Sequence, residues 1–434
     1  MKFIIIFILS ILNVSTLSAA EFLTYLQSAY KSNPVLNAQR ENYKSVKENI
    51  NISKSEFLPS VSISGSQSSQ ENSNRKNQLG ATLPDNSNNS KTQSISVDQK
   101  IFQGFQGYNL IKKSKLELDQ AALKLKNTEQ QILLQSARAY YDLVYKIKNT
   151  RFNLSNVDLF ERQVESDSSR LQKGEITLTD LAQSESSLAG ANAKFIEAET
   201  ELLTTKSNFE RIIRLSAPEK IVKDNFIKNI SLNFPTSLST AYTFSEKNNP
   251  KLLLARVDYK ISEKNVDIEK SKFSPSASVN YTKSQNKDFS SSVNEIDEEN
   301  LKATVIIPLF KGGKNYSLLK KSKFKKEQSN LLLQDTVNEV KTDTANSWSA
   351  YQSSESVLKA TQAQVKAAEI ANEGITLEYD SGNTRTTLEV IQSRSLLLEA
   401  RINNAIAERN FAVSKFELLA VIGQLTLENL QKSK

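Results

Sequence analysis

Four short segments of the chain alternate apolar and polar residues with a period of two. The first two cover about 58–66 and 93–102, and the second two cover about 275–283 and 300–309. One apolar face and one polar face are typical of a half-buried sheet, or of a transmembrane barrel strand of about 9–11 residues. A soluble sheet packed on helices is the alternative. The polar face is almost uniformly Ser, Asn and Thr, which favours barrel strands.

Polar stretches join the members of each strand pair, and we expect them to be loops in the water outside the cell: Gln67–Lys91 and Ser284–Glu299. Four strands cannot close a barrel, because closure needs about eight. Open edges in lipid would leave backbone groups unpaired, at several kcal/mol each. If the strands span a membrane, three copies of the chain would give twelve strands around a water-filled bore.

Apolar residues elsewhere recur at steps of seven, as they do from Leu118 to Ala139. Sustained heptads predict helices that wind around neighbouring helices. The first helix would cover about 105–173, and the chain would return as a second helix over 176–216. With the usual rise per residue, the outgoing helix would be about 100 Å long.

A second helical hairpin follows the same plan. Its outgoing helix would run from Tyr316 to about Tyr379, and its returning helix would end at Val421. Gly174 and Gly382 are the left-handed residues expected to end the two outgoing helices. Both hairpin tips would then lie at one end, far from the strands.

The sequence is duplicated with a period of about 200 residues. Asn33-Pro34 returns as Asn249-Pro250, and many residues after each pair match at the same shift. This period is far longer than the roughly 20–50 residues of a solenoid repeat. We therefore predict a mainly helical, internally duplicated chain with a small β part. The predicted boundaries are a signal peptide at 1–20, a first repeat at 21–216 with its tip near 174, a linker at 217–234, a second repeat at 235–423 with its tip near 382, and a C-terminal tail at 424–434.

The composition argues against an enzyme. The chain has no cysteine and no histidine, so disulfides, thiolate metal sites and the usual general base are excluded. Carboxylates alone can bind calcium or magnesium, but no Asp-rich loop with ligand spacing is present. We predict no catalytic residues, no metal and no cofactor.

The N-terminus has the features of a secretory signal peptide. Lys2 precedes the apolar run Phe3–Leu12, and Ser18-Ala19-Ala20 supplies small residues for a cut before Glu21. The run is shorter than the roughly 20 residues that a membrane helix needs. We expect an exported protein without a membrane-spanning helix, and no lipid anchor, because no cysteine stands near the cut.

A formal net charge of +8 raises the question of nucleic acid, but basic and acidic residues alternate along the predicted helices, as on a solvated surface. We expect no nucleic-acid partner. Two lysine clusters, Lys112–Lys115 and Lys320–Lys326, stand just after the strands. Solvated helix charge and contact with anionic outer-membrane lipid are both open interpretations of these clusters.

The whole mature chain resembles the TolC family of outer-membrane channel proteins. Ile307–Gly313 resembles the family's motif at the passage from strand to helix, and Asn33-Pro34 and Asn249-Pro250 match its duplicated helix starts. Arg170–Glu185 is similar to members that serve type I secretion. The resemblance implies a homotrimer with a twelve-stranded barrel and a long helical tunnel. Such a trimer would dock on a periplasmic adaptor protein and, through it, on an inner-membrane ABC or other transporter.

The resemblance also implies a gate at the hairpin tips. Thr179 and Asp180 stand where, in the family, residues link to a tyrosine and an arginine across the second tip, here Tyr379 and Arg385. Charge-assisted bonds there would hold the helices inward, with roughly 1–3 kcal/mol each. One extra residue between Gly382 and Arg385 departs from the family pattern. Ordinary pairing on the helix surface is the alternative.

A ring of carboxylates is implied further along the second hairpin. The family has two acidic residues one helical turn apart, and the matching positions here are Glu389 and Gln392. Because an amide replaces one carboxylate, the ring would carry three charges per trimer rather than six. Carboxylates that face one axis can select cations.

The tips are implied to contact the adaptor through Gly174 with Glu175, and through Gly382 with Asn383. These residues also suit the ends of helices, and the two roles are compatible. We therefore predict the exit channel of a type I secretion or efflux system, with type I secretion favoured. An exported trimeric coiled-coil structural protein or adhesin is the competing interpretation, although it would not need two strands at matching points of both halves.

Overall fold

The computed structural model describes residues 14–219, 234–289, 293–381 and 385–432. The two halves have the same order of elements, which confirms a mainly helical, duplicated fold with four strands. The first half contains α2 (Val14–Ser32), α3 (Pro34–Ser55), β1 (Ser60–Asn72), β2 (Asn86–Gln103), α4 (Gln106–Gln172) and α5 (Leu178–Ile213). The second contains α7 (Leu238–Asn248), α8 (Pro250–Ser271), β3 (Ser276–Lys287), β4 (Glu295–Ile306), α9 (Lys314–Asp380) and α10 (Thr387–Val421), and α11 (Leu427–Lys432) follows.

The chain forms two compact units, and each unit takes equivalent segments from both halves. The first unit comprises Met1–Glu41, Leu123–Leu253 and Asp335–Lys434, and the second comprises Asn42–Ala122 and Leu254–Gln334. The units therefore cut across the predicted repeats, because each hairpin and each strand pair assembles with its counterpart. Most of the predicted linker at 217–234 lies outside the described residues.

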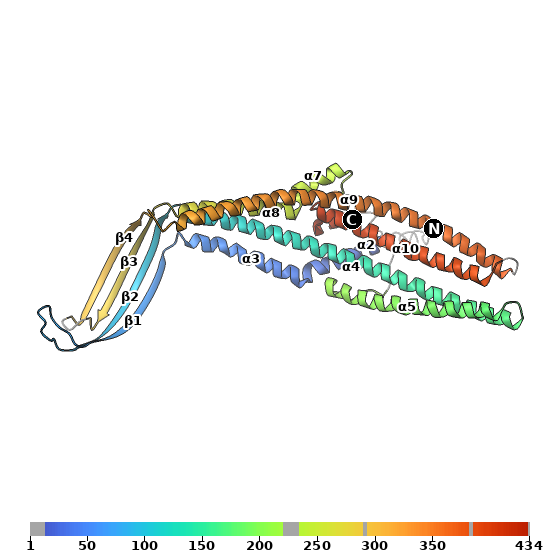
Figure 1. Ribbon diagram of the computed structural model, residues 1–434, viewed down its shortest axis with the longest axis horizontal. Helices are drawn as coiled ribbons and strands as arrows, with labels where there is room; N and C mark the ends of the chain where they lie inside the picture. Colours follow the sequence, from blue (N-terminus) through green and yellow to red (C-terminus); the bar gives the residue numbers. More distant parts are fainter. Residues whose placement is uncertain (1–13, 220–233, 290–292, 382–384, 433–434) are drawn as a thin grey trace, which may run out of the picture. The chain divides into compact units, whose positions relative to one another are not determined.

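The second unit is built around one antiparallel sheet with the strand order β1-β2-β3-β4, and Figure 1 shows the four strands side by side. The register places apolar residues opposite one another across all strands, in the row Val61, Val97, Tyr281 and Leu301. The neighbouring row is polar and comprises Ser62, Ser96, Thr282 and Asn300. The predicted alternation is thus present as two different faces of a single sheet.

The strands are longer than predicted, and much of the two stretches expected as loops is strand. β1 continues to Asn72 and β2 begins at Asn86, whereas the loop was expected over Gln67–Lys91. β3 and β4 likewise extend into Ser284–Glu299. Polar residues occupy both faces of these extensions, so no period of two marks them, yet backbone pairing continues. β4 ends at Ile306, before Pro308, which has no N–H to donate.

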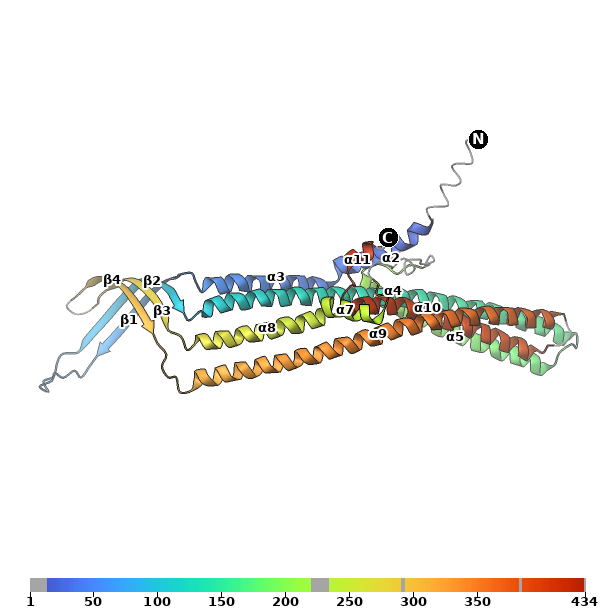
Figure 2. The same ribbon diagram turned by 90° about the horizontal axis from the view of Figure 1, so that it is seen from above.

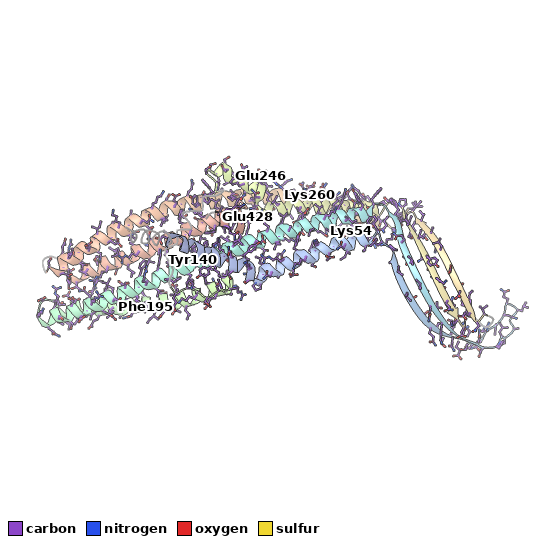
Figure 3. The ribbon with its side chains drawn as sticks, turned by 180° about the vertical axis from the view of Figure 1, so that it is seen from behind. Lys54, Tyr140, Phe195, Glu246, Lys260 and Glu428 are labelled. Carbon is purple, nitrogen blue, oxygen red and sulfur yellow. The ribbon has the colours of Figure 1, made fainter. Side chains whose placement is uncertain are left out.

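The outgoing helices α4 and α9 each contain 67 residues, for which the α-helical rise gives about 100 Å along the axis. Figure 2 shows that α5 returns along α4 and that α10 returns along α9. Figure 3 marks Tyr140 on α4 and Phe195 on the returning helix α5. Among the described residues, no helix combines the length and the apolar character needed to cross a membrane.

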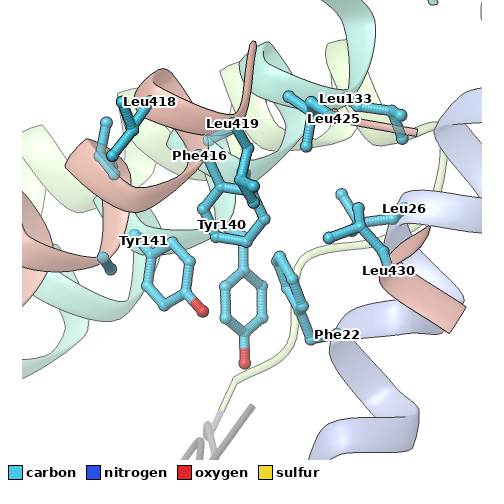
Figure 4. Packing of buried hydrophobic residues seen from close by; sticks show 14 of the residues in the cluster. Phe22, Leu26, Leu133, Tyr140, Tyr141, Phe416, Leu418, Leu419, Leu425 and Leu430 are labelled. Atoms are coloured by element: carbon cyan, nitrogen blue, oxygen red, sulfur yellow. The ribbon is translucent and has the colours of Figure 1, made fainter. Parts of the chain in front are cut away.

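An aromatic core holds the first unit together, and Figure 4 shows it from close by. Phe22 of α2 contacts Tyr140 of α4 and Phe416 of α10, with ring centroids 4.7 and 5.8 Å apart. The predicted C-terminal tail, for which the sequence offered no role, contributes two leucines to this core: Leu425, which precedes α11, and Leu430 of α11. α2 continues through the predicted cleavage site, and removal of residues 1–20 stays a prediction, as residues 1–13 lie outside the described part.

Candidate functional site at the helical tips

The first hairpin turns at Gly174, where the backbone conformation, rather than a lack of space, requires a glycine. Gly174 has φ of +74°, and a Cβ there would meet nothing within 4 Å. Its N–H donates to the carbonyl of Leu171, and the N–H of Glu175 donates to the carbonyl of Arg170, each at 2.9 Å. These two bonds form a Schellman motif, in which a left-handed residue satisfies the last carbonyls of a helix. Gly174 therefore ends α4, as its position predicted.

A capping box starts the returning helix α5, and Asp180 is part of it. The carboxylate of Asp180 accepts hydrogen bonds from the N–H and the hydroxyl of Thr177, at 3.0 and 2.7 Å. In return, the N–H of Asp180 donates to the Thr177 hydroxyl. The backbone and side-chain bonds from Thr177 lower the pKa of Asp180. Thr177, rather than Ile176, thus determines where the helix begins.

The second tip contains a capping box as well, at the start of α10. Glu389 accepts from the N–H and the hydroxyl of Thr386, at 2.8 and 3.0 Å. Arg385 bridges the two arms of the hairpin, because its guanidinium donates to Glu378 at 2.6 Å and to Glu389 at 3.0 Å. The Thr386 backbone N–H, followed by Arg385, lowers the pKa of Glu389. Gly382 and Asn383 lie outside the described residues.

The links predicted between the two tips are not formed within one chain. Asp180 is engaged by Thr177, Arg385 is engaged by two glutamates, and Thr179 is exposed. Tyr379 instead donates its hydroxyl hydrogen bond to Asp167 at 2.8 Å. The capping boxes explain the difference, because each uses its carboxylate locally. Links between neighbouring copies of the chain stay a prediction.

The structure brings together six polar residues that sequence reasoning did not combine, and we call them the tip network: Gln163, Asp167, Ser184, Tyr379, Thr387 and Arg394. They come from all four tip helices of the first unit. Five of them are buried, and Asp167 and Ser184 are fully so. Burial raises the pKa of Tyr379 and lowers the pKa of Arg394.

The heptad spacing of α4 could have identified Asp167, the residue at the centre of this network. Steps of seven from Leu118 and Ala139 lead to Asn153, Phe160 and Asp167, and these last three are all buried. A polar residue on an apolar seam fixes the register of packed helices. The heptad, continued to the end of α4, would have indicated Asp167 as a buried carboxyl.

Glu389 and Gln392 lie where the predicted ring needs them on α10, near its start. Gln392 is exposed and Glu389 is half-exposed. Among the described residues, none forms a hydrogen bond or an ion pair with the Gln392 side chain. The ring itself requires three copies and stays a prediction.

Comparison with known proteins agrees with this architecture. The sequence profile of the outer membrane efflux protein family matches residues 25–213 and 243–424. The outer membrane efflux protein BepC of Brucella suis is 26% identical over 407 residues, which are 93% of this chain and 86% of BepC. The outer membrane protein TolC of Vibrio cholerae is 24% identical, over 77% of each protein.

Solved structures show the same fold. The outer membrane channel CmeC of Campylobacter jejuni superposes with a TM-score of 0.80 at 14% identity, over 96% of this chain and 89% of CmeC. The predicted resemblance to the TolC family is confirmed, and family members are outer-membrane channels of Gram-negative bacteria rather than enzymes. The match on both halves shows that this chain belongs to the outer membrane efflux protein family.

Proposed function

We propose that three copies of this chain form the outer-membrane exit channel of a tripartite export system. The carrying observation is the four-stranded sheet, which has one apolar face, one polar face and two open edges. A sheet of this kind is stable neither alone in water nor alone in lipid.

The apolar face is suited to lipid. Val61, Leu301 and Val305 are 66%, 73% and 68% exposed, although they share one face of the sheet. β1 is exposed on both faces, with only Asn72 partly shielded. A soluble sheet would have covered such residues with helices, since burying each would contribute roughly 1.5–3 kcal/mol. The exposure favours a barrel wall over a sheet packed on helices.

The polar face is suited to a water-filled bore. Its small hydroxyl side chains bond to one another across strands, as Ser64 does with Ser94 at 2.8 Å and Ser96 does with Thr282 at 3.2 Å. Alternation of lipid-facing and lumen-facing residues is the mark of an outer-membrane barrel.

The open edges supply the argument for three copies. β1 and β4 each pair on one side only. In lipid the free side would leave several kcal/mol of unmet hydrogen bonding per group. Three chains pair β4 of one copy with β1 of the next and give twelve strands without an edge.

The tips are proposed to meet the other parts of the export system. In this proposal a periplasmic adaptor protein contacts Gly174 with Glu175 and Gly382 with Asn383, and an inner-membrane transporter lies beyond it. The similarity of Arg170–Glu185 to type I secretion members supports protein secretion through an ABC transporter. Efflux of small molecules is the second candidate, and the name of BepC as an efflux protein favours it.

Purified protein in planar bilayers tests the proposal. We expect stepwise conductance, together with heat-modifiable trimers in outer-membrane fractions. An exported adhesin would give trimers without conductance, and that result would reject the channel. Secretion and efflux separate in a strain that lacks the gene: loss of one secreted protein with unchanged drug resistance supports secretion, and the reverse supports efflux.

A further inference from the structure

We infer that Ile307–Lys311, which is not a strand in the single chain, becomes the last part of β4 when a second copy of the chain docks beside it. The pairing partner is the start of β1 in that copy, and the internal duplication determines the register. The inference rests on the proposed trimeric channel, and it specifies which residues meet where one copy joins the next.

The two strand pairs of the chain correspond residue by residue. The shift of the Asn-Pro pairs relates β1 to β3, and the shift between the Phe-x-Gly motifs at the strand ends relates β2 to β4. The pair Ser60↔Asp98 thereby corresponds to Ser276↔Ile306, and both pairs are formed. Every further pair of the β3–β4 ladder has its counterpart in the β1–β2 ladder in the same way. The observed pairing therefore supports the correspondence derived from the sequence.

The chain itself contains one junction between its two halves, where β2 pairs with β3. The end of β2, Gln99–Gln103, pairs with β3 alone, because β1 begins at Ser60 opposite Asp98. The counterpart of this end in the second half is Ile307–Lys311. Because β3 begins opposite Ile306, no strand of the same chain flanks that segment. A strand from another copy would supply the missing neighbour.

The junction inside the chain is a template for the junction between copies. Gln99 lies opposite Val279 in the β2–β3 ladder. The corresponding residues are Ile307 of one copy and Ile63 of the next. The duplication thus predicts that these two isoleucines are directly opposite each other in the assembled barrel.

The segment is apolar and uncovered in the single chain. Ile307, Leu309 and Phe310 are 62%, 92% and 83% exposed. The turn before β1, which would lie beside this segment in the assembly, also exposes more than half of Phe57 and Leu58. Docking would cover apolar residues of both copies, which favours association in water and at the membrane surface.

Two corresponding glycines give an independent indication of the missing neighbour. Gly104 and Gly312 follow the strand ends and have φ of +59° and +56°. A Cβ on Gly104 would lie 2.4 Å from the Cβ of Ser274 and 2.6 Å from the carbonyl oxygen of Ser271, whereas a Cβ on Gly312 would meet nothing within 4 Å. Gly312 therefore has the backbone conformation of Gly104 without the contact that Gly104 makes.

The surface that corresponds to this contact is the turn before β1. Ser271 and Ser274 correspond to Ser55 and Leu58 in the first half. The N–H of Ser274 donates to the carbonyl of Ser271 at 3.1 Å, and the N–H of Leu58 donates to the carbonyl of Ser55 at 3.0 Å. Because the two turns share this bond, the turn at Ser55 already has the shape that Gly312 of another copy would meet.

Pro308 is compatible with a strand at this position. A proline is accepted in a strand where its missing N–H faces no partner. The β3 side of Pro308 has no partner strand, because β3 begins at Ser276 opposite Ile306. Pairing on the other side, with β1 of the next copy, remains available.

Paired cysteines test the register, since the native chain has no cysteine. We expect oxidation of Ile307→Cys/Ile63→Cys in outer-membrane fractions to produce covalent dimers and trimers. Their yield should be several-fold higher than for Ile307→Cys/Gly65→Cys, the pair that a two-residue slip would bring together. β1 and β4 lie at opposite edges of the sheet (Figure 1), so the bond joins different copies.

Gln99→Cys/Val279→Cys is the matched control, because the same pairing lies within one chain. It should form internal bonds and no covalent dimers. Preferential bonding of the slipped pair, or intact trimers in which neither pair bonds, would overturn the inference. If Ile307→Cys disturbs assembly, Ile306→Cys with Ser64→Cys tests the same register with the same two outcomes.

A second measurement concerns the glycine contact. Gly313 also has a positive φ, of +76°, but its counterpart Phe105 carries a side chain at φ of +67°. We therefore expect Gly312→Ala to reduce trimers in outer-membrane fractions several-fold more than Gly313→Ala. Equal losses would contradict docking of Gly312 on the turn at Ser55. A native chain that forms no trimers would reject the proposed channel instead, so the two failures are distinguishable.

Discussion

At the scale of single residues, the returning helices of both hairpins begin with the same kind of cap, although their sequences differ. Thr177 with Asp180, and Thr386 with Glu389, each form a reciprocal cap in which hydroxyl and carboxylate satisfy the first free N–H groups of a helix. Carboxylates that motif comparison assigns to a gate thus have a local task in the single chain. Their local bonds contribute to stability whether or not a gate exists.

Asp180 gives the cap a pH dependence. Its pKa is lowered in the folded protein, chiefly by the backbone N–H of Thr177. A lowered carboxyl pKa contributes stability that is present above the unfolded value of about 3.9 and is lost as the pH falls through the folded pKa. We expect Asp180→Asn to lower the melting temperature at pH 7, and the difference from the native protein to disappear in stronger acid.

Asp158→Asn, at an exposed position inside α4, is the control for this measurement and should change little at either pH. A difference between Asp180→Asn and the native protein that persists unchanged below the folded pKa would show that the charge of Asp180 does not support the cap.

Arg385 partly neutralises Glu389, the one carboxylate left in the predicted ring. Exposed pairs of this kind contribute only about 0–1 kcal/mol to stability, so Arg385→Ser should leave the trimer intact. We expect it to raise single-channel conductance and cation preference in planar bilayers, because three unpaired carboxylates would face the axis. Arg401→Ser, which breaks the exposed pair between Arg401 of α10 and Glu369 of α9, should change neither quantity. Identical conductance in both variants would reject the gate position.

At the scale of elements, side-chain alternation and backbone pairing determine different properties of the sheet. Alternation sets which face meets lipid, while pairing continues beyond it, as in Gln67↔Lys91 and Asn72↔Asn86. Adjacent residues of β4 therefore point to opposite faces, and this permits a sharp comparison.

Leu301 and Asn300 are neighbours on β4 and belong to opposite rows of the sheet. An arginine on the lipid face near the middle of the bilayer costs about 2–4 kcal/mol, while one in the lumen is solvated. We expect Leu301→Arg to reduce trimers in outer-membrane fractions. Asn300→Arg should assemble normally and shift ion selectivity toward anions. Equal assembly of both variants would contradict the assignment of the two faces.

The sequence predicted the elements that depend on patterns within a single segment of the chain. Apolar alternation located the strands, heptads located the hairpins, and Gly174 marked the end of α4. The strand extensions escaped because polar residues on both faces carry no period. The tip network escaped because Asp167, Ser184 and Tyr379 meet only after two hairpins pack together. The role of the C-terminal segment was not predicted, because Leu425 and Leu430 are buried only against a core that other parts of the chain form.

At the scale of the whole molecule, duplication explains why the chain divides as it does. Both compact units contain matching segments of each half, so neither half is an independent domain. A single chain is likewise not a complete unit, because its sheet has two unpaired edge strands and an exposed apolar face. The central claim is that three chains complete it.

Native mass spectrometry of the protein extracted from outer membranes in detergent tests this claim most directly, because it counts chains and retained lipid together. The account predicts a complex of three chains that needs detergent or lipid to stay in solution. A monomer that is soluble without detergent would contradict it.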